Sequence, residues 1–555
     1  MLLPPAEYCL SVQIGQSAAS GWRFELCFDL GRFFSAAHVI KFCHFFWLLK
    51  HWLDDHSLFP ISLITNELLF LELIFKLFLV MLLRPSLVQP PLRALFRCLH
   101  SSSHHLQQPK LVLGIETSCD DTGIALLRAS DGAILAEVTA SQTALHVSNG
   151  GIIPPVARDL HRSAIDRCVG ECLKTAGGGV SARDLAAVAV TLRPGLSLSL
   201  LVGCQYAKKL SAKYHLPVVP IHHMEAHALT AMLQYGDQLR FPFLCLLISG
   251  LLWCFEMTPA NHKNKQLKEL SDLGGHCLIV HVKGLHDFEL LGRSIDDAPG
   301  DILDKTARAL RLKNLGPPYS QVSGGAAVEL MARSGNPFSH FERATSTPLY
   351  SSRRRTCNFS FSGFLTAITR HIARLEEETG LAADGVLPQA PDICASLLYV
   401  LSFTLIKRLQ RAYAFLEQRQ ENDPSSGSFS KRLVVSGGCA ANQFIGGMLQ
   451  AFAADQGLQL FIPRPGLCTD NGVMIAWNGV LKLREEEEEG ISPPGAILRD
   501  QAAIQQLDIQ PKAALGVDIT RAVTDAHIKT ERIDVKSYVG GLLHQKDQQQ
   551  QSSKT

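Results

Sequence analysis

The sequence predicts a mixed α/β fold, because short apolar runs alternate with longer stretches of helical periodicity between residues 110 and 519. At 46% hydrophobic and 19% charged residues, the chain is too apolar for wholesale disorder and unlike a collagen or coiled-coil fibre. Its 555 residues suffice for roughly three to four units, or for two large units plus extensions. The runs expected to be strands are residues 111–115, 186–191, 244–248 and 433–435, and a representative helical stretch is 160–174.

The first 109 residues contain the excess of apolar residues, and they include two segments of different composition. Residues 57–83 approach membrane-spanning length but contain Glu67, Glu72 and Lys76, so we expect no membrane anchor. Residues 81–109 are rich in arginine and serine and contain no acid, which predicts a mitochondrial transit peptide starting at an internal methionine, with a disordered basic linker as the alternative. Residues 1–80 are then an atypical hydrophobic extension upstream of it.

Charge and cysteine usage narrow the partners and the compartment. The formal net charge is +2, so an RNA partner must be bound by a local basic patch or by another subunit. The fifteen cysteines are scattered and form no CxxC pair, which favours a reducing compartment over a disulfide scaffold or a four-cysteine zinc site. The acidic run Glu485–Glu489, after a predicted helix, is expected to be a solvated segment.

Residues 110–142 begin the ordered body with three β-rich segments joined by polar turns, which predicts an antiparallel meander. The turn at 116–123 combines hydroxyls, carboxylates and a glycine, a composition that suits phosphate or a cation but is also typical of plain hairpins. Two more glycine-bearing turns follow strands, at 191–196 and 435–442. In the latter, Gly437 and Gly438 let backbone amides approach an anion at the start of the next helix.

His223 and His227 are four residues apart, so on a helix both imidazoles lie on one face and suit one metal ion. A zinc protease of the HExxH type needs its glutamate directly after the first histidine, and Glu225 is two residues on, which disfavours that class. A third ligand must come from elsewhere. Asp470, just before a predicted helix, is the candidate, with Cys468 as a softer competitor.

Together these segments resemble the tRNA threonylcarbamoyladenosine transferases of the actin-like ATPase superfamily, and most closely their mitochondrial branch. The matching strings follow one another in order over residues 110–520: GIETSCDDTGIA, SQTALHVSNGGIIPPVARDLH, TLRPGLSLSLLVG, HHMEAH, SIDDAPGDILDKTAR, NFSFSG, SGGCAAN and CTDNGVMIAW. Pro155 departs from the glutamate of many relatives outside mitochondria. The resemblance implies a duplicated actin-like (RNase H-like) α/β fold with two subdomains around a central cleft. The implied parts are subdomain I at 110–240, subdomain II at 241–468, a return to subdomain I at 469–520 and a polar tail at 521–555.

The implied activity is transfer of the threonylcarbamoyl group of threonylcarbamoyl-adenylate to N6 of adenosine 37 in mitochondrial tRNAs that read codons beginning with A. A separate enzyme would make the adenylate, the protein would work in the mitochondrial matrix, and a homodimer is expected. The resemblance also implies one divalent metal ion, zinc and iron being the candidates. No catalytic side-chain nucleophile is required, because the adenosine amine attacks an activated carbonyl and catalysis rests on positioning and electrostatics.

Carried over position by position, the resemblance assigns roles to fourteen residues. The metal ligands are His223, His227 and Asp470. Asp304 contacts the nucleotide, Gly325 and Glu329 lie on its ribose side, Gly437, Gly438 and Asn442 belong to the loop that holds the adenylate, and Thr469 neighbours a metal ligand. Ser249, Gly250, Gly275 and His276 form the phosphate turn.

That phosphate turn is interrupted here by residues 251–274, which have no counterpart in the family pattern and look like retained intron sequence. Doubling a loop costs only about 0.6 kcal/mol, so we expect the flanking strands still to pair. The donors around phosphate need placement within about 0.5 Å, so we expect weak adenylate binding and keep an inactive isoform as one alternative. The others are a metalloprotease, a small-molecule kinase of the same superfamily and a degenerate scaffold.

Overall fold

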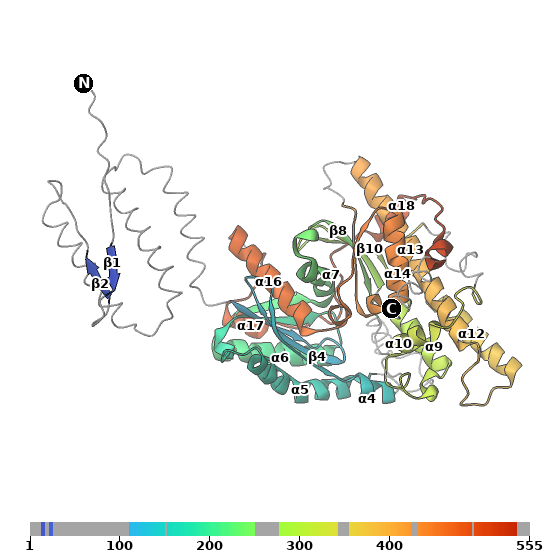
Figure 1. The fold of residues 1–555 in the computed structure, drawn as a ribbon, viewed down its shortest axis with the longest axis horizontal. Coiled ribbons are helices and arrows are strands. Elements are labelled where there is room, and N and C mark those ends of the chain that lie inside the picture. The colour runs from blue at the N-terminus through green and yellow to red at the C-terminus, as the bar shows by residue number, and fades with distance from the viewer. Residues whose placement is uncertain are drawn as a thin grey trace, which may run out of the picture. The chain divides into compact units, whose positions relative to one another are not determined.

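The computed structural model describes residues 13–16, 22–25, 110–149, 152–249, 277–341, 355–422, 430–490 and 493–540 (Figure 1). The chain separates into two compact units, Met1–Gln107 and Gln108–Thr555. In the first unit, β1 (Gln13–Gln16) and β2 (Trp22–Glu25) pair antiparallel. The expected apolar stretch at 57–83, the transit segment at 81–109 and the insertion at 251–274 lie outside the described residues.

The first sheet of the second unit has five strands in the order β5-β4-β3-β6-β7. Strands β3, β4 and β5 pair antiparallel, which confirms the predicted meander, and β6 and β7 continue the sheet in parallel with β3. The strands are β3 (Leu111–Glu116), β4 (Asp121–Arg128), β5 (Ile134–Ser141), β6 (Leu185–Arg193) and β7 (Val218–His222).

The second sheet repeats this topology and adds one edge strand, in the order β12-β11-β8-β9-β10-β13. Strands β8, β9 and β10 form an antiparallel meander, β11 lies parallel to β8, and β12 lies parallel to β11. The duplicated α/β fold is therefore confirmed. The strands are β8 (Phe243–Ile248), β9 (Cys277–Val282), β10 (Phe288–Arg293), β11 (Arg432–Ser436), β12 (Gln459–Phe461) and β13 (Val517–Asp518).

The two halves each pack one helix against the sheet of the other half. Helix α7 (His223–Tyr235) follows β7 of the first sheet, yet its apolar face shares a core with β8 and β9 of the second. Helix α16 (Gly472–Glu489) comes after β12 of the second sheet in the chain, yet it shares a core with β3, β4 and β6 of the first. Helices α5 (Pro154–Thr175) and α6 (Ser197–Tyr214) pack on the first sheet without exchange. The exchange brings the starts of α7 and α16 together.

Glycines let α16 lie directly on the first sheet. A Cβ atom on Gly114 of β3 would stand 2.3 Å from the carbonyl oxygen of Gly472, and one on Gly123 of β4 would stand 2.7 Å from the Gly472 nitrogen. Only a residue without a side chain permits this approach of two backbones. The two glycines therefore fix the position of the first turn of α16 and of Asp470 just before it.

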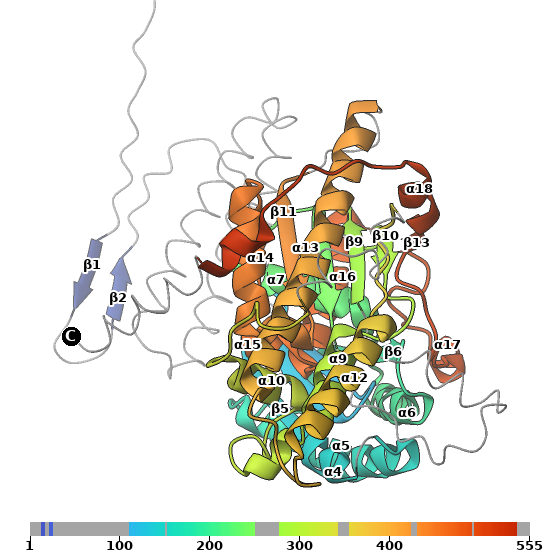
Figure 2. The same cartoon turned by 90° about the vertical axis from the view of Figure 1, so that its right-hand side faces the viewer.

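The largest core lies beside the second sheet, under helices that connect β10 to β11. In Figure 2 α13, the longest of these helices, lies in front of that sheet. Within the described ranges, α13 is the one helix long and apolar enough to cross a membrane, and its apolar residues are packed into this core. The helices are α9 (Pro299–Ala309), α10 (Gly324–Ala332), α12 (Ser362–Thr379) and α13 (Ala390–Asn422), followed by α14 (Gln443–Asp455) and α15 (Pro465–Cys468).

Two segments near the C-terminus make contacts beyond their expected solvated state, although residues 487–489 of the acidic run are exposed as expected. The acidic run is the last turn of α16, where Glu485 pairs with His286, Glu486 with Arg499 and Glu487 with Lys110. Part of the expected polar tail packs instead, because apolar residues between 523 and 539 join the largest core. The remaining short elements are α4 (Thr143–Ser148), α17 (Gln501–Gln506), α18 (Thr520–Asp525), η3 (Ala182–Asp184), η4 (Gly236–Gln238), η5 (Leu312–Leu315) and η8 (Gly438–Ala441).

Candidate metal and nucleotide site

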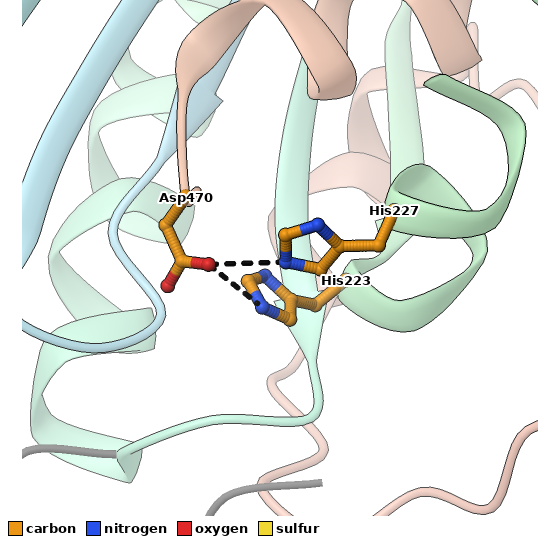
Figure 3. A group of neighbouring side chains, drawn as sticks. All are labelled: His223, His227 and Asp470. Atoms are coloured by element: carbon orange, nitrogen blue, oxygen red, sulfur yellow. Dashed lines mark hydrogen bonds and ion pairs between the residues drawn. The ribbon is translucent and has the colours of Figure 1, made fainter. Parts of the chain in front are cut away.

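The two histidines and the aspartate of the predicted metal site meet where the exchanged helices begin. His223 is the first residue of α7, and His227 follows one turn later, so both rings leave the same face as their spacing predicts. Asp470 precedes α16, whose N-cap Asn471 accepts a hydrogen bond from the Met474 amide at 2.8 Å. Figure 3 shows both imidazoles directed at the Asp470 carboxylate.

The geometry of this group suits one divalent cation. Asp470 Oδ1 lies 3.0 Å from His227 Nε2 and 3.4 Å from His223 Nε2, and the candidate ligand atoms all lie within 4.8 Å of one another (Figure 3). Two imidazole nitrogens and one carboxylate oxygen are the ligands of catalytic zinc and iron sites that keep open positions for a substrate. The residues present therefore fit a bound metal ion.

Glu116, at the end of β3, contacts the His223 ring on the side that faces away from Asp470. Its Oε2 lies 3.1 Å from His223 Nδ1 and accepts a 2.6 Å hydrogen bond from Thr191 Oγ1, and the residue is 0% exposed. A carboxylate on the far nitrogen of a ligating histidine fixes the tautomer and the ring orientation. The sequence placed Glu116 only in a turn that suits phosphate or a cation. A lone acid that ends an otherwise apolar strand was the available signal for this role.

The electrostatics of the group favour a cation. Burial lowers the pKa of His223, but the Asp470 and Glu116 carboxylates outweigh it and raise that pKa to about 10. Burial raises the pKa of Asp470, but His223 and His227 outweigh it and leave that pKa well below its usual range. The site thus holds positive charge between its two carboxylates, and a metal ion at the same place would displace a proton.

The positions of Cys468 and Glu225 disfavour the two competing interpretations, in which Cys468 is a metal ligand or Glu225 is a protease base. Cys468 lies outside the ligand group, with its Sγ 3.1 Å from the Pro463 carbonyl oxygen, and burial raises the pKa of its thiol to about 12. The Glu225 carboxylate faces α16, where its Oε2 lies 3.7 Å from Lys482 Nζ in a nearly buried ion pair. Glu225 therefore links α7 to α16 through this ion pair. The general base of a metalloprotease would have to face the metal ion, so Glu225 is not placed for that role.

The residues expected on the nucleotide side tie three helices together. Asp304 of α9 accepts a 3.0 Å hydrogen bond from the Gly325 amide of α10, and a Cβ on Gly324 would stand 2.3 Å from Asp304 Oδ1. Burial raises the pKa of Asp304 to about 6, although this backbone hydrogen bond lowers it. Glu329 of α10 accepts a 3.0 Å hydrogen bond from the Gln443 amide at the start of α14.

The glycine loop after β11 lies beside the end of β8. Gly437 has φ 96°, and a Cβ on it would stand 2.6 Å from the Ile248 carbonyl oxygen, next to Ser249. Asn442 caps α14 by accepting a 3.0 Å hydrogen bond from the Ile445 amide. The structure therefore brings Ser249, Gly437, Gly438 and Asn442 to one edge of the second sheet, while Thr469 is exposed beside Asp470.

Three predicted residues of the phosphate turn, Gly250, Gly275 and His276, lie outside the described residues. The strands on either side of the turn are described. Ile248 of β8 pairs directly with Cys277 of β9, and the register continues without a shift to Phe243 and Val282. The expectation that these strands pair despite the insertion is confirmed.

Comparison with known proteins identifies the family. The family model TsaD, tRNA N6-adenosine threonylcarbamoyltransferase, matches residues 133–252 and 270–477. The mitochondrial tRNA N6-adenosine threonylcarbamoyltransferase of Rattus norvegicus is 42% identical over 446 residues, which is 80% of this chain and 92% of that protein. The chain belongs to the TsaD family.

Other TsaD relatives extend the match across kingdoms. The mitochondrial transferase of Homo sapiens is 41% identical over 451 residues, 81% of this chain and 97% of that protein. The transferase of Cereibacter sphaeroides is 37% identical over 392 residues, 70% of this chain and 93% of that protein. The two matched segments of the TsaD model leave out residues 253–269, which fall inside the 251–274 insertion.

Proposed function

We propose that this chain acts in mitochondria as a tRNA N6-adenosine threonylcarbamoyltransferase, using threonylcarbamoyl-adenylate made by a separate enzyme and modifying adenosine 37. Membership of the TsaD family carries the transferase activity and the tRNA substrate. The single observation that carries the site is the group of two histidines and one aspartate at the meeting point of α7 and α16.

His223, His227 and Asp470 would hold one divalent ion, with zinc and iron both matching the donor set. When bound, the ion supplies positive charge beside the phosphate and carboxylate oxygens of the adenylate. Glu116 keeps the His223 ring oriented toward that position through its contact with Nδ1. The assignment is supported by the position of His227, which is 1% exposed and whose Nε2 lies 3.0 Å from Asp470 Oδ1.

In the proposed reaction the adenosine N6 attacks the carbonyl carbon of the threonylcarbamoyl group. The new N–C bond forms, the C–O bond to the phosphate breaks, AMP leaves with the electron pair, and N6 loses one proton. We assign the nucleotide of the adenylate to Asp304, Gly325, Glu329, Gly437, Gly438 and Asn442. The chain's part is to bind and orient both substrates, so the rate enhancement rests on proximity and preorganised charge.

The alternatives make different demands on the protein. A metalloprotease would need Glu225 on the metal side, whereas its carboxylate pairs with Lys482. A kinase of the same superfamily would consume ATP stoichiometrically without an adenylate-forming enzyme. Incubating the chain with tRNA and either threonylcarbamoyl-adenylate or ATP, followed by mass spectrometry of tRNA nucleosides, separates the two. Modified adenosine only with the adenylate supports the proposal, and its absence with wild-type chain contradicts it.

We further propose the matrix as the compartment, a mature start near residues 98–110 and a homodimer. The acid-free, basic composition of residues 81–109 supports the first two. N-terminal sequencing of the protein isolated from mitochondria tests the start, and finding residues 1–80 on the stable protein would contradict it. Sedimentation of the same material tests the dimer.

A further inference from the structure

The turn that follows β3 lies against the proposed metal site. Glu116 Oε2 and Ser118 Oγ are each 3.1 Å from Nδ1 of His223, on the side of the ring away from the proposed ion. The Ser118 amide also donates a hydrogen bond to the Glu116 carboxylate, so the two contacts are coupled through the turn. A shift of this turn would therefore change how the His223 ring is held.

The first part of the turn is fixed by the start of α6. Thr117 Oγ1 donates a 3.0 Å hydrogen bond to the Ser199 carbonyl oxygen. The Leu196 amide donates one of 2.8 Å to the Ser118 carbonyl oxygen. A Cβ on Gly195 would stand 2.6 Å from that same oxygen, so only a glycine leaves room for this approach. The second part of the turn is held by a different helix, α5.

His161 of α5 holds the second part of the turn at two points. Its Nε2 lies 2.9 Å from the Cys119 carbonyl oxygen, and its Nδ1 lies 2.8 Å from Oγ1 of Thr122, the second residue of β4. Both His161 and Thr122 are 0% exposed. The two nitrogens of one buried imidazole therefore join α5 to the turn and to the strand that follows it.

The chemistry of these two partners fixes the tautomer of His161. A carbonyl oxygen can only accept, so the ring hydrogen lies at Nε2 and is donated to Cys119. Nδ1 then carries the lone pair and accepts from the Thr122 hydroxyl. Burial lowers the pKa of His161, although the hydrogen bond to Cys119 raises it, and the net lowering leaves the ring neutral at about pH 7. His161 is thus a neutral link with one donor end and one acceptor end.

We propose that His161 is a positioning residue for the metal site. It holds the turn after β3 in the place where Glu116 and Ser118 contact His223. Groups behind a ligating histidine orient its ring, and the residues that place those groups contribute to metal affinity through them. His161 acts on the ligand through the main chain of the turn, from Cys119 back to Glu116. The inference rests on the proposed function, because it concerns the orientation of one ligand of the proposed metal site.

The test measures the zinc affinity of the metal-free full chain by competition with a chromophoric chelator, with Asp470→Ala as the blank for zinc bound elsewhere. Thr122→Val keeps the shape of the side chain but removes the hydroxyl that donates to His161. Zinc affinity should fall about tenfold, the lower end of the loss of about 10- to 100-fold typical of a supporting group, because the effect reaches the ion through the turn. Thr122→Ser retains the hydroxyl and should bind zinc like wild type.

The matched control is Thr404→Val on α13, which removes a hydroxyl that donates a 2.8 Å hydrogen bond to the Val400 carbonyl oxygen in the other half. Urea unfolding of the metal-free variants checks that each is folded and separates a loss of stability from a loss of affinity. Wild-type zinc affinity in Thr122→Val would overturn the inference. An equal loss of affinity in Thr122→Ser or in Thr404→Val would overturn it too, because the hydroxyl beside His161 would then have no specific effect.

A double-mutant cycle tests the route through the turn. In Glu116→Gln one contact that the turn controls is already weakened, so adding Thr122→Val should lower zinc affinity by a smaller factor than it does in wild type. Full additivity would contradict the route. Wild-type chain that binds no more zinc than the Asp470→Ala blank contradicts the proposed metal site and this inference with it, whereas tight wild-type binding with an unaffected Thr122→Val contradicts this inference alone.

Discussion

The two halves of the second unit share a strand order but differ in the connection between their third and fourth strands. In the first half, residues 142–184 contain little more than α4 and α5. In the second half, residues 294–431 contain α9, α10, α12 and α13 and build the largest core. The compact sheet contributes Glu116 and the start of α7, whereas the long connection carries Asp304, Gly325 and Glu329. The metal group thus depends on what the halves share. The proposed nucleotide contacts are divided between the long connection and the loop after β11, which belongs to the shared topology.

We expect the largest effect when one proposed metal ligand is removed from the site where the two halves meet. In His227→Ala, transfer should fall to below about 1% of wild type, because loss of a ligand exceeds the 10- to 100-fold effect typical of a supporting partner. The measurement is the rate of adenosine modification with threonylcarbamoyl-adenylate. His215→Asn is the matched control, since this left-handed residue (φ 56°) lies outside the site and asparagine tolerates its conformation. Retained transfer in His227→Ala would show that the ligands are misassigned.

Deleting residues 251–274 tests the second half alone. Because Ile248 and Cys277 already pair, the shortened chain should unfold at nearly the wild-type temperature. Its kcat/KM should rise by as much as about 100-fold, the loss that a misplacement of about 1 Å in a positioning site can cause. Equal transfer rates for the full and shortened chains would mean that the insertion leaves the phosphate turn undisturbed.

The substitution Glu116→Gln tests what the first sheet contributes to metal binding. The amide keeps the size of the side chain but removes the charge that orients His223 through Nδ1. Metal affinity should fall by about 10- to 100-fold, with transfer restored by excess metal. Titration of the metal-free protein measures it, and Glu137→Gln, on β5 of the same sheet, is the charge-matched control. Wild-type affinity in Glu116→Gln would limit the residue to a structural contact.

The smallest effect is on stability in the second half. Burial raises the pKa of Asp304 to about 6, so the folded state holds a proton that the unfolded state releases between about pH 4 and 6. The stability that depends on that proton is present below about pH 4 and is lost as pH rises through about 6. Asp304→Asn cannot ionise and can still accept from the Gly325 amide. It should therefore gain about 1–3 kcal/mol over wild type between pH 4 and pH 7 in urea unfolding, and a pH-independent difference would contradict the assignment.

Local patterns in the sequence were sufficient for much of the fold. Apolar runs such as residues 111–115 and 244–248 became β3 and β8, and four-residue spacing placed His223 and His227 on one helix face. Contacts between distant residues could not be predicted in this way. Glu116 meets His223 across 107 positions, and the glutamates at the end of α16 contact His286 and Arg499 from other segments.

The exchange of α7 and α16 is likewise a property of topology. No periodicity within residues 223–235 or 472–489 states which sheet each helix will cover. The resemblance to a known family supplied the ligand set, and the structure supplies the physical cause of its assembly.

The central claim is that one metal ion is held jointly by the starts of α7 and α16, so that the exchange of helices creates the site. Metal content of purified full chain, measured by mass spectrometry of the ions alongside Asp470→Ala, tests it most directly. We expect about one equivalent of a divalent transition metal in wild type, the His2Asp donor set being suited to one ion, and strong depletion in Asp470→Ala with the fold intact. An unchanged metal content in Asp470→Ala would contradict the claim, because the ion would then bind without the helix of the second half.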